Sequence, residues 1–215
     1  MIYINFNKNK MISMYKEDLF KSSIFAGFCI GIAGFGYLVN PVIGMFLFCI
    51  WLIAVVQYKL KLYTGTAGFV KDEKDMEDLA WIFVGNFFGC FIASILAMCS
   101  PFDLQSAANA ILDKRLAAGW WNSGILSIAC GFLMTTAVTF ARKSKEFADW
   151  LPLLFGVPMF ILCGFPHCIA DTFYYLCCSR VKILMEPDFA YLYLSIILGN
   201  FLGCNMYKLF IKQNN

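Results

Sequence analysis

Long apolar runs constrain this chain more than any other feature of its sequence. A helix needs about 20 apolar residues to cross the hydrocarbon core of a bilayer. Charged residues make up only 14% of the chain, against about 25% in a soluble domain, so lipid must solvate much of the surface. We therefore predict an all-α polytopic membrane protein with six transmembrane helices, at Ser22–Val39, Pro41–Val70, Leu79–Cys99, Leu116–Ala141, Trp150–Cys178 and Phe189–Tyr207.

The remaining composition excludes several other classes of protein. The net charge is only +3, and the basic residues do not gather with aromatics as nucleic-acid binding requires. The sequence has no glycine-rich phosphate loop and no carboxylate pair on a plausible active face, and Ser127 and His167 lie in no catalytic motif, so we expect neither an enzyme nor an ATP-driven pump. Cys163, His167 and Cys168 are ligand types without a convincing fourth member, so we expect no metal and no cofactor.

Basic residues around the predicted spans set the expected topology. The first apolar run lacks a small-residue cleavage site and exceeds a signal h-region in length, so we expect it to remain as a span. With six spans, both termini share one side, which carries eleven basic residues: Lys8, Lys10, Lys16, Lys21, Lys71, Lys74, Arg142, Lys143, Lys145, Lys208 and Lys212. The other side carries four: Lys114, Arg115, Arg180 and Lys182. The positive-inside rule therefore predicts cytoplasmic termini in the cell (inner) membrane.

The second and fifth apolar segments are too long for simple spans. Thirty helical residues would reach about 45 Å, whereas the hydrocarbon is about 30 Å thick. Polar or helix-breaking residues interrupt both segments, at Gln57–Gly65 with Lys59 and Lys61, and at Cys163–Asp171 with Pro166. Because non-helical backbone at membrane depth must be buried or line a wet cavity, we predict a broken helix in each segment.

An internal repeat relates the two halves of the chain. Gly85–Cys90 in the third span and Gly199–Cys204 in the sixth agree at five of six positions. The interrupted segments are the middle members of the two triplets, and an odd number of spans inverts the second copy. Such inverted repeats with matching breaks indicate a transport pathway near the midplane. We therefore predict one channel domain, residues 1–215, with repeat halves at about 22–110 and 116–210.

At both breaks the chain resembles the formate/nitrite transporter family. That family carries Leu-Phe-Thr-Gly in its second span and Gly-Phe-Glu-His-Ser-Ile-Ala-Asn in its fifth. Here the corresponding segments are Leu62–Gly65 and Gly164–Asp171, and the Gly-Asn-x-x-Gly pattern of spans three and six also matches. The resemblance implies an aquaporin-like six-helix protomer in a homopentamer, with one pore per protomer for small monovalent anions. It also places the pore histidine on His167 and the loop threonine on Thr64.

The same alignment implies two apolar constrictions and reveals four departures. The outer constriction falls near Phe48, Leu52 and Phe160, and the inner one near Leu62 and Tyr63. The family's acid before its Leu-Phe-Thr is Lys61 here, and a small residue nearby is Lys59. The glutamate before the histidine is Pro166, and the asparagine after it is Asp171. Polar groups that hold the two loops in the family have therefore been exchanged.

Each candidate pore residue admits more than one role. His167 is the only histidine; as an intramembrane ionisable group it either supplies a proton to the anion or simply hydrogen-bonds the two loops. Lys59 and Lys61 either snorkel at the end of the second span, or one of them attracts anions to the inner vestibule or pairs with Asp171. Thr64 is expected to cap the short second half-helix, which is compatible with a hydroxyl that points into the pore.

Three functions fit this sequence. The first is a passive or proton-coupled channel for small monovalent anions or their conjugate acids, of the formate, nitrite and hydrosulfide class. The second is a channel for neutral solutes such as water, ammonia or hydrogen sulfide. The third is a membrane sensor or scaffold that keeps the fold without transport. The cations near the breaks favour the first function, Asp171 leaves room for the second, and the exchanged residues Lys61, Pro166 and Asp171 support the third.

Overall fold

The computed structural model describes the backbone of residues 2–210 and the side chains of residues 13–180 and 182–210. Its regular elements in this part of the chain are all helical, as predicted. In order they are α1 (Ile2–Val39), α2 (Pro41–Gln57), α3 (Tyr63–Thr66), η1 (Ala67–Phe69), α4 (Glu73–Met98), α5 (Leu104–Arg142), η2 (Phe147–Trp150), α6 (Leu151–Leu162), α7 (Cys168–Cys177), α8 (Val181–Leu184), α9 (Pro187–Asn205) and α10 (Tyr207–Phe210). The side chains of Lys8, Lys10 and Lys212, which entered the topology argument, lie outside the described residues.

Four helices in the described part of the chain are long and apolar enough to cross a membrane. They include α1 from Ser13 onward, α4, α5, and α9 continued by α10. The second and fifth predicted spans contain shorter apolar helices instead, at Pro41–Gln57 and Phe147–Leu162. Each of these shorter helices ends where the polar or helix-breaking residues of its segment begin.

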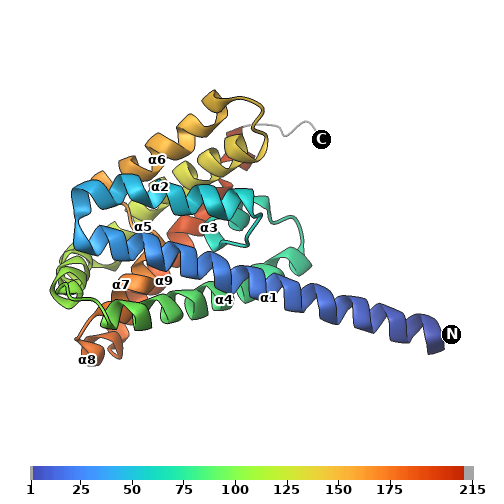
Figure 1. Cartoon of the computed structure of the whole chain (residues 1–215), viewed down its shortest axis with the longest axis horizontal. Coiled ribbons are helices and arrows are strands. Elements are labelled where there is room, and N and C mark those ends of the chain that lie inside the picture. The colour runs from blue at the N-terminus through green and yellow to red at the C-terminus, as the bar shows by residue number, and fades with distance from the viewer. Residues whose placement is uncertain (1, 211–215) are drawn as a thin grey trace.

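The helices form two packed groups that exchange their short helices. α1 packs against α2 and α4 in the first half, and α5 packs against α6 and α9 in the second. α7 packs against α4 of the first half, while α3 and η1 pack against α9 and α5 of the second. Figure 1 shows α2 and α6 running alongside one another across the molecule. The short helices therefore lie in the interior, where the two halves meet.

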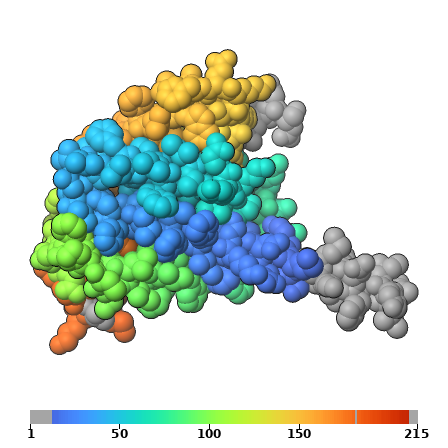
Figure 2. Space-filling view, viewed as in Figure 1, coloured from blue at the N-terminus to red at the C-terminus, as the bar shows by residue number. Residues whose placement is uncertain are grey.

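The outer surface is apolar over much of the bundle. Figure 2 shows a face covered largely by α1 and α2, with α6 next to α2. Along α2 the exposed side chains include Val42, Ile43, Phe46, Leu47 and Ile50. A soluble domain rarely exposes an apolar surface of this extent, so this face suits a lipid or a subunit interface.

The glycines of the repeated motif allow close contact between helices. A Cβ atom added at Gly89 of α4 would lie 2.0 Å from the carbonyl oxygen of Ile24 in α1. The corresponding atom at Gly203 of α9 would lie 1.9 Å from the carbonyl oxygen of Ile128 in α5. Small residues of this kind let membrane helices approach backbone to backbone.

The long helix α5 is divided at Gly119, which the sequence analysis did not anticipate. Gly119 has φ +74° and ψ 168°, a non-helical conformation within the element. Glycine adopts a positive φ without the steric cost that a Cβ brings. The predicted fourth span at Leu116–Ala141 therefore corresponds to the regular stretch 120–142, and residues 104–118 form a separate helical arm that carries Arg115.

Candidate functional site

The first break lies between α2 and α3. The backbone turns at Tyr58 and Lys59, where Lys59 has φ 53°, and runs extended at Leu62 before it re-enters helix. Leu62 is the N-cap of α3 and makes no side-chain capping bond. Thr64 lies inside α3, so the predicted capping role for its hydroxyl was wrong: the helix begins at Tyr63, two residues too early for Thr64 to serve as its cap.

The second break lies between α6 and α7. The chain leaves α6 at Leu162, passes Gly164 with φ 69°, and enters α7 after His167. His167 is the N-cap of α7, and its Nδ1 atom accepts a hydrogen bond of 3.2 Å from the backbone N–H of Ala170. The histidine is therefore held in place by the end of the helix that it begins.

Two asparagines hold the two breaks through matching sets of hydrogen bonds. Asn86 of α4 accepts from the N–H of Tyr63 (2.8 Å) and donates to the carbonyl oxygens of Lys61 (2.9 Å) and Ser23 (2.8 Å). Asn200 of α9 accepts from the N–H of Cys168 (2.8 Å) and donates to the carbonyl oxygens of Pro166 (2.9 Å) and Ser127 (2.8 Å). Both side chains are fully buried.

Sequence reasoning missed this role of the asparagines, although it had the signal for it. Gly85–Cys90 and Gly199–Cys204 repeat an asparagine as well as two glycines. A polar side chain repeated at the same place within an apolar span is itself informative, because buried polar groups in a membrane protein need partners. The partners here are the backbone groups that the two breaks leave outside the helical hydrogen-bond ladder.

Thr64 and His167 meet directly between the two breaks. Thr64 Oγ1 lies 2.9 Å from His167 Nε2, and both residues are buried. Because Nδ1 accepts from a backbone N–H, it carries no hydrogen, and a neutral ring then bears its hydrogen on Nε2. The Nε2–H group donates to Thr64. An imidazolium at this position would lose the bond from Ala170 N–H and would add positive charge at a helix N-terminus.

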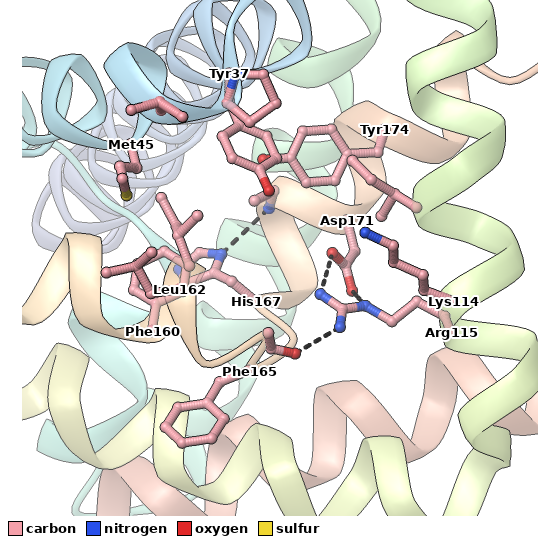
Figure 3. A pocket seen from close by; sticks show the side chains of 16 residues that line it. Tyr37, Met45, Lys114, Arg115, Phe160, Leu162, Phe165, His167, Asp171 and Tyr174 are labelled. Carbon is pink, nitrogen blue, oxygen red and sulfur yellow. Dashed lines mark hydrogen bonds and ion pairs between the residues drawn. The ribbon is translucent and has the colours of Figure 1, made fainter.

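One cavity, which we call the Asp171 cavity, opens beside the second break. It encloses about 300 Å³ and is lined by the residues drawn in Figure 3, among them Tyr37, Met45, Lys114, Arg115, Phe160, His167, Asp171 and Tyr174. Asp171 is buried and pairs with Arg115, at 3.1 Å to Nε and 3.3 Å to Nη2. Arg115 Nη1 also donates to the carbonyl oxygen of Gly164, at 2.6 Å.

The hypothesis that Lys61 pairs with Asp171 was therefore wrong. Asp171 lies beyond the second break, in the first turn of α7, where its partner is Arg115 from the arm of α5 before Gly119. Lys61 belongs to the first break and lines a different cavity. Its main-chain groups bond to Ser22 and Asn86. In the sequence, Arg115 contributes only to the count of basic residues on one side of the membrane. Its pairing with Asp171 has no local signal, because the two residues are 56 positions apart.

The second cavity, which we call the Arg142 cavity, opens beside the first break. It encloses about 490 Å³, and its lining includes Leu62, Gly65, Val138, Arg142 and Trp150, together with Lys59 and Lys61. Arg142 Nη2 donates to the carbonyl oxygen of Gly65 at 3.0 Å, and its guanidinium carbon lies 4.7 Å from the centre of the Phe69 ring. Sequence analysis used Arg142 only for the topology and did not foresee this contact.

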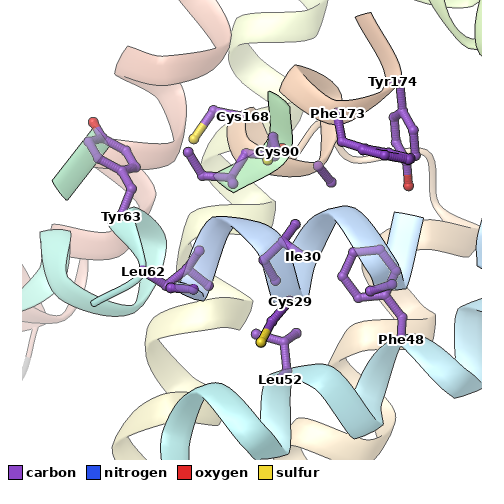
Figure 4. Packing of buried hydrophobic residues seen from close by; sticks show 14 of the residues in the cluster. Cys29, Ile30, Phe48, Leu52, Leu62, Tyr63, Cys90, Cys168, Phe173 and Tyr174 are labelled. Carbon is purple, nitrogen blue, oxygen red and sulfur yellow. The ribbon is translucent and has the colours of Figure 1, made fainter. Parts of the chain in front are cut away.

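The side chains that were predicted to form the two constrictions do not all lie together in the structure. Phe160 stacks on His167 with ring centres 5.6 Å apart and meets Phe48 edge to face at 6.2 Å. Figure 4 shows Phe48, Leu52 and Leu62 within the buried apolar cluster. Tyr63 is directed elsewhere: its ring contacts Phe83, and its hydroxyl donates to the carbonyl oxygen of Ile197.

The buried contact between Thr64 and His167 joins the linings of the two cavities. His167 lines the Asp171 cavity, while Leu62 and Gly65, on either side of Thr64 in the chain, line the Arg142 cavity. The arrangement thus consists of two water-accessible cavities and a short, largely apolar barrier with one neutral polar pair. Among the described residues no three histidine, cysteine or acidic side chains gather as metal ligands.

Comparison with known proteins identifies the family. A model of the formate/nitrite transporter family matches residues 4–212. A formate channel, FocA, of Haemophilus influenzae is 23% identical over 181 residues, which cover 72% of this chain and 64% of that relative. Two solved structures share the fold. A pentameric formate channel with formate bound has a TM-score of 0.75 at 21% identity, covering 91% of this chain and 95% of its own.

The other structure, an ion channel of the same family, has a TM-score of 0.76 at 19% identity, over 92% of this chain and 90% of its own. The resemblance inferred from the two break motifs is confirmed. The matched family is one of transporters rather than enzymes, and its model extends over nearly the whole chain. This multi-pass membrane protein belongs to the formate/nitrite transporter family.

Proposed function

We propose that the chain is a passive or proton-coupled channel for small monovalent anions or their conjugate acids, such as formate, nitrite and hydrosulfide. The observation that carries this proposal is the Thr64–His167 contact of 2.9 Å, which joins two cavities lined by cations. The pathway runs from the Asp171 cavity past His167 and Thr64 into the Arg142 cavity. The family and its formate channel relatives support a substrate of this class.

The fold that we propose for this channel is the aquaporin-like one. It has six membrane crossings in two inverted three-helix repeats, at about 22–110 and 116–210, with the second and fifth helices broken. The matching bonds of Asn86 and Asn200 support the repeat relation. We further propose a homopentamer in the cell (inner) membrane with both termini cytoplasmic. A pentameric channel with a TM-score of 0.75 supports that assembly.

The barrier between the cavities presents hydrogen-bond donors without a charge. A bare anion pays several kcal/mol or more to enter an apolar constriction. The Nε2–H of His167 and a rotated Thr64 hydroxyl can each donate to one oxygen of a small anion, which offsets part of that cost. A neutral ring has no acidic proton to release to formate, so a protonated substrate would take its proton from water in a cavity.

A proteoliposome flux assay with formate, nitrite, hydrosulfide and chloride at several pH values tests this function. Transport of the conjugate acid predicts formate uptake that rises about tenfold for each unit of falling pH at fixed total formate, whereas transport of the anion predicts a weak pH dependence. The variant His167→Ala should reduce flux of every transported anion, and Gln105→Ala, an exposed change on α5, should leave flux unaltered.

Neutral-solute conduction is the second candidate, and a specific observation favours it. Arg115 is neutralised by Asp171, and the neutral His167 leaves the barrier without charge. The same vesicles measured for water, ammonia and hydrogen sulfide distinguish it: neutral flux with exclusion of every anion would replace the main proposal. A chain with no flux of either kind would support the sensor or scaffold function.

A further inference from the structure

The two cavities differ in the charge of the side chains that line them. The lining of the Arg142 cavity contains three cations, Lys59, Lys61 and Arg142, and no acid. The lining of the Asp171 cavity contains two cations, Lys114 and Arg115, and one acid that is ion-paired with Arg115. A concave site lined by charge of one sign raises the local concentration of counter-ions, so the Arg142 cavity should hold anions more strongly.

Arg142 is the cation of this cavity whose side chain hydrogen-bonds to the backbone beside Thr64. Its bond to the Gly65 carbonyl places it one residue from Thr64. Arg115 makes the corresponding contact at the other break, through the carbonyl oxygen of Gly164. Arg142 is the last residue of α5 and Arg115 lies in the arm of α5 before Gly119. Of the pair, only Arg115 has a carboxylate partner among the described residues.

Asp149, an acid that adjoins this lining in the chain, is held by its own turn. Asp149 precedes Trp150 of the cavity lining, and its Oδ2 accepts the N–H groups of Lys145 (2.8 Å) and Glu146 (3.2 Å). These two backbone bonds lower the pKa of Asp149 and direct its carboxylate at the turn. A simpler role for Arg142 is to complement the C-terminal end of the α5 dipole, but that role requires neither the contact with Gly65 nor two further cations.

We propose that the Arg142 cavity is an anion-collecting vestibule, with Arg142 as its anchor, and that this vestibule makes anion transport asymmetric in affinity. Formate entering from the Arg142 cavity half-saturates transport at a lower concentration than formate entering from the Asp171 cavity. This inference rests on the proposed function. A passive pathway must have the same ratio of maximal rate to half-saturating concentration in both directions, so the maximal rate from the Arg142 cavity is lower by the same factor.

The test is zero-trans formate uptake into proteoliposomes, measured separately for each orientation with equal pH on both sides. Cys99 and Cys163 are the exposed cysteines among the described residues. Cys163 lies between Leu162 and Gly164 of the Asp171 cavity lining, and α4, which Cys99 caps, ends at the same end of the bundle as α6 (Figure 1). Labelling of separate aliquots with an impermeant maleimide therefore reports the orientation. At low ionic strength we expect half-saturating concentrations that differ about three- to tenfold. The difference should shrink in 0.5 M salt of an impermeant anion, because exposed charges are screened.

Four variants separate charge from structure. Arg142→Gln should remove most of the difference between the two sides, and Arg142→Lys, which keeps the charge, should retain most of it. Lys61→Gln leaves the bond to Gly65 intact and should also reduce the difference. Lys114→Gln, the matched change in the Asp171 cavity, should increase it. Saturable formate uptake with equal half-saturation from both sides would overturn this inference alone, whereas absence of anion uptake from either side would refute the proposed function.

Discussion

The matched asparagines provide the sharpest test of how the two breaks are held. Asn86 and Asn200 are fully buried, and each makes three hydrogen bonds, two of them to backbone groups of its break. A side-chain hydrogen bond between membrane helices contributes about 0.6 kcal/mol on average and up to about 1.7. Asn86→Ala and Asn200→Ala should therefore each lower the free energy of unfolding by roughly 2–5 kcal/mol.

The matching contacts of the two asparagines also predict how the two losses of stability compare. Because the two asparagines bond to equivalent backbone groups, the two losses should agree within about 1 kcal/mol, given the usual context dependence of hydrogen bonds. Asn200→Asp keeps the volume and one acceptor but places a second oxygen against the carbonyls of Pro166 and Ser127. It should therefore destabilise the protein at least as much as Asn200→Ala.

Unfolding of the purified protein in mixed micelles with increasing SDS, followed by tryptophan fluorescence, measures these differences. Gln105→Ala is the matched control, since Gln105 is an exposed amide in α5 and surface changes usually stay within about 0.5 kcal/mol. A loss below about 1 kcal/mol for either buried asparagine would refute the reasoning. Full stability of Asn200→Asp would show that shape, and not hydrogen bonding, matters at this position.

Two further predictions concern helix packing and capping. Gly203→Ala should destabilise the protein by about 1–3 kcal/mol, because the added Cβ would lie 1.9 Å from the Ile128 carbonyl oxygen and overpacking costs that much. Gly36→Ala should not destabilise it, because no atom lies within 4 Å of a Cβ added there. Thermal unfolding of both variants in detergent tests this difference. Asp103 caps α5, and hydrogen bonds from Ser106 lower its pKa. The stabilisation that the Asp103 carboxylate gives the folded protein is present above the unfolded-state pKa and is lost as pH falls through the folded-state pKa. The Tm difference between wild type and Asp103→Ala should therefore shrink from pH 7 to pH 3. A Tm difference that grows over this range would contradict the prediction.

Much of the fold could be predicted from local sequence, because hydropathy and helix-breaking residues act over short stretches of the chain. The charge-poor runs indicated a helical membrane protein, and the polar residues around Lys59 and Pro166 marked where α2 and α6 end. The motifs at these two breaks also sufficed to identify the family, which the match over residues 4–212 confirms. Gly119 gave no such signal, since a glycine inside an apolar helix is compatible with either continuation or a turn.

The hydrogen-bond and ion-pair partners of the polar residues could not be predicted from local sequence patterns. The sequence placed Lys61 and Asp171 at corresponding breaks, which suggested a pair, and it treated Thr64 as a cap. In the structure Asp171 meets Arg115, Thr64 meets His167, and Arg142 reaches Gly65. These partners are 56, 103 and 77 residues apart, so only packing of the two halves brings them together.

The apolar runs and the residues that interrupt them therefore determined, by themselves, that the chain is a helical membrane protein and where α2 and α6 end. A run of about 20 apolar residues has few alternatives to a membrane helix, because its backbone must satisfy its own hydrogen bonds in lipid. The charged residues within and beside those runs have no local partner. Only the tertiary structure decided that one arginine is neutralised by Asp171 while the other lines a cavity of cations, because a buried charge pairs with whichever group the fold brings within a few ångströms.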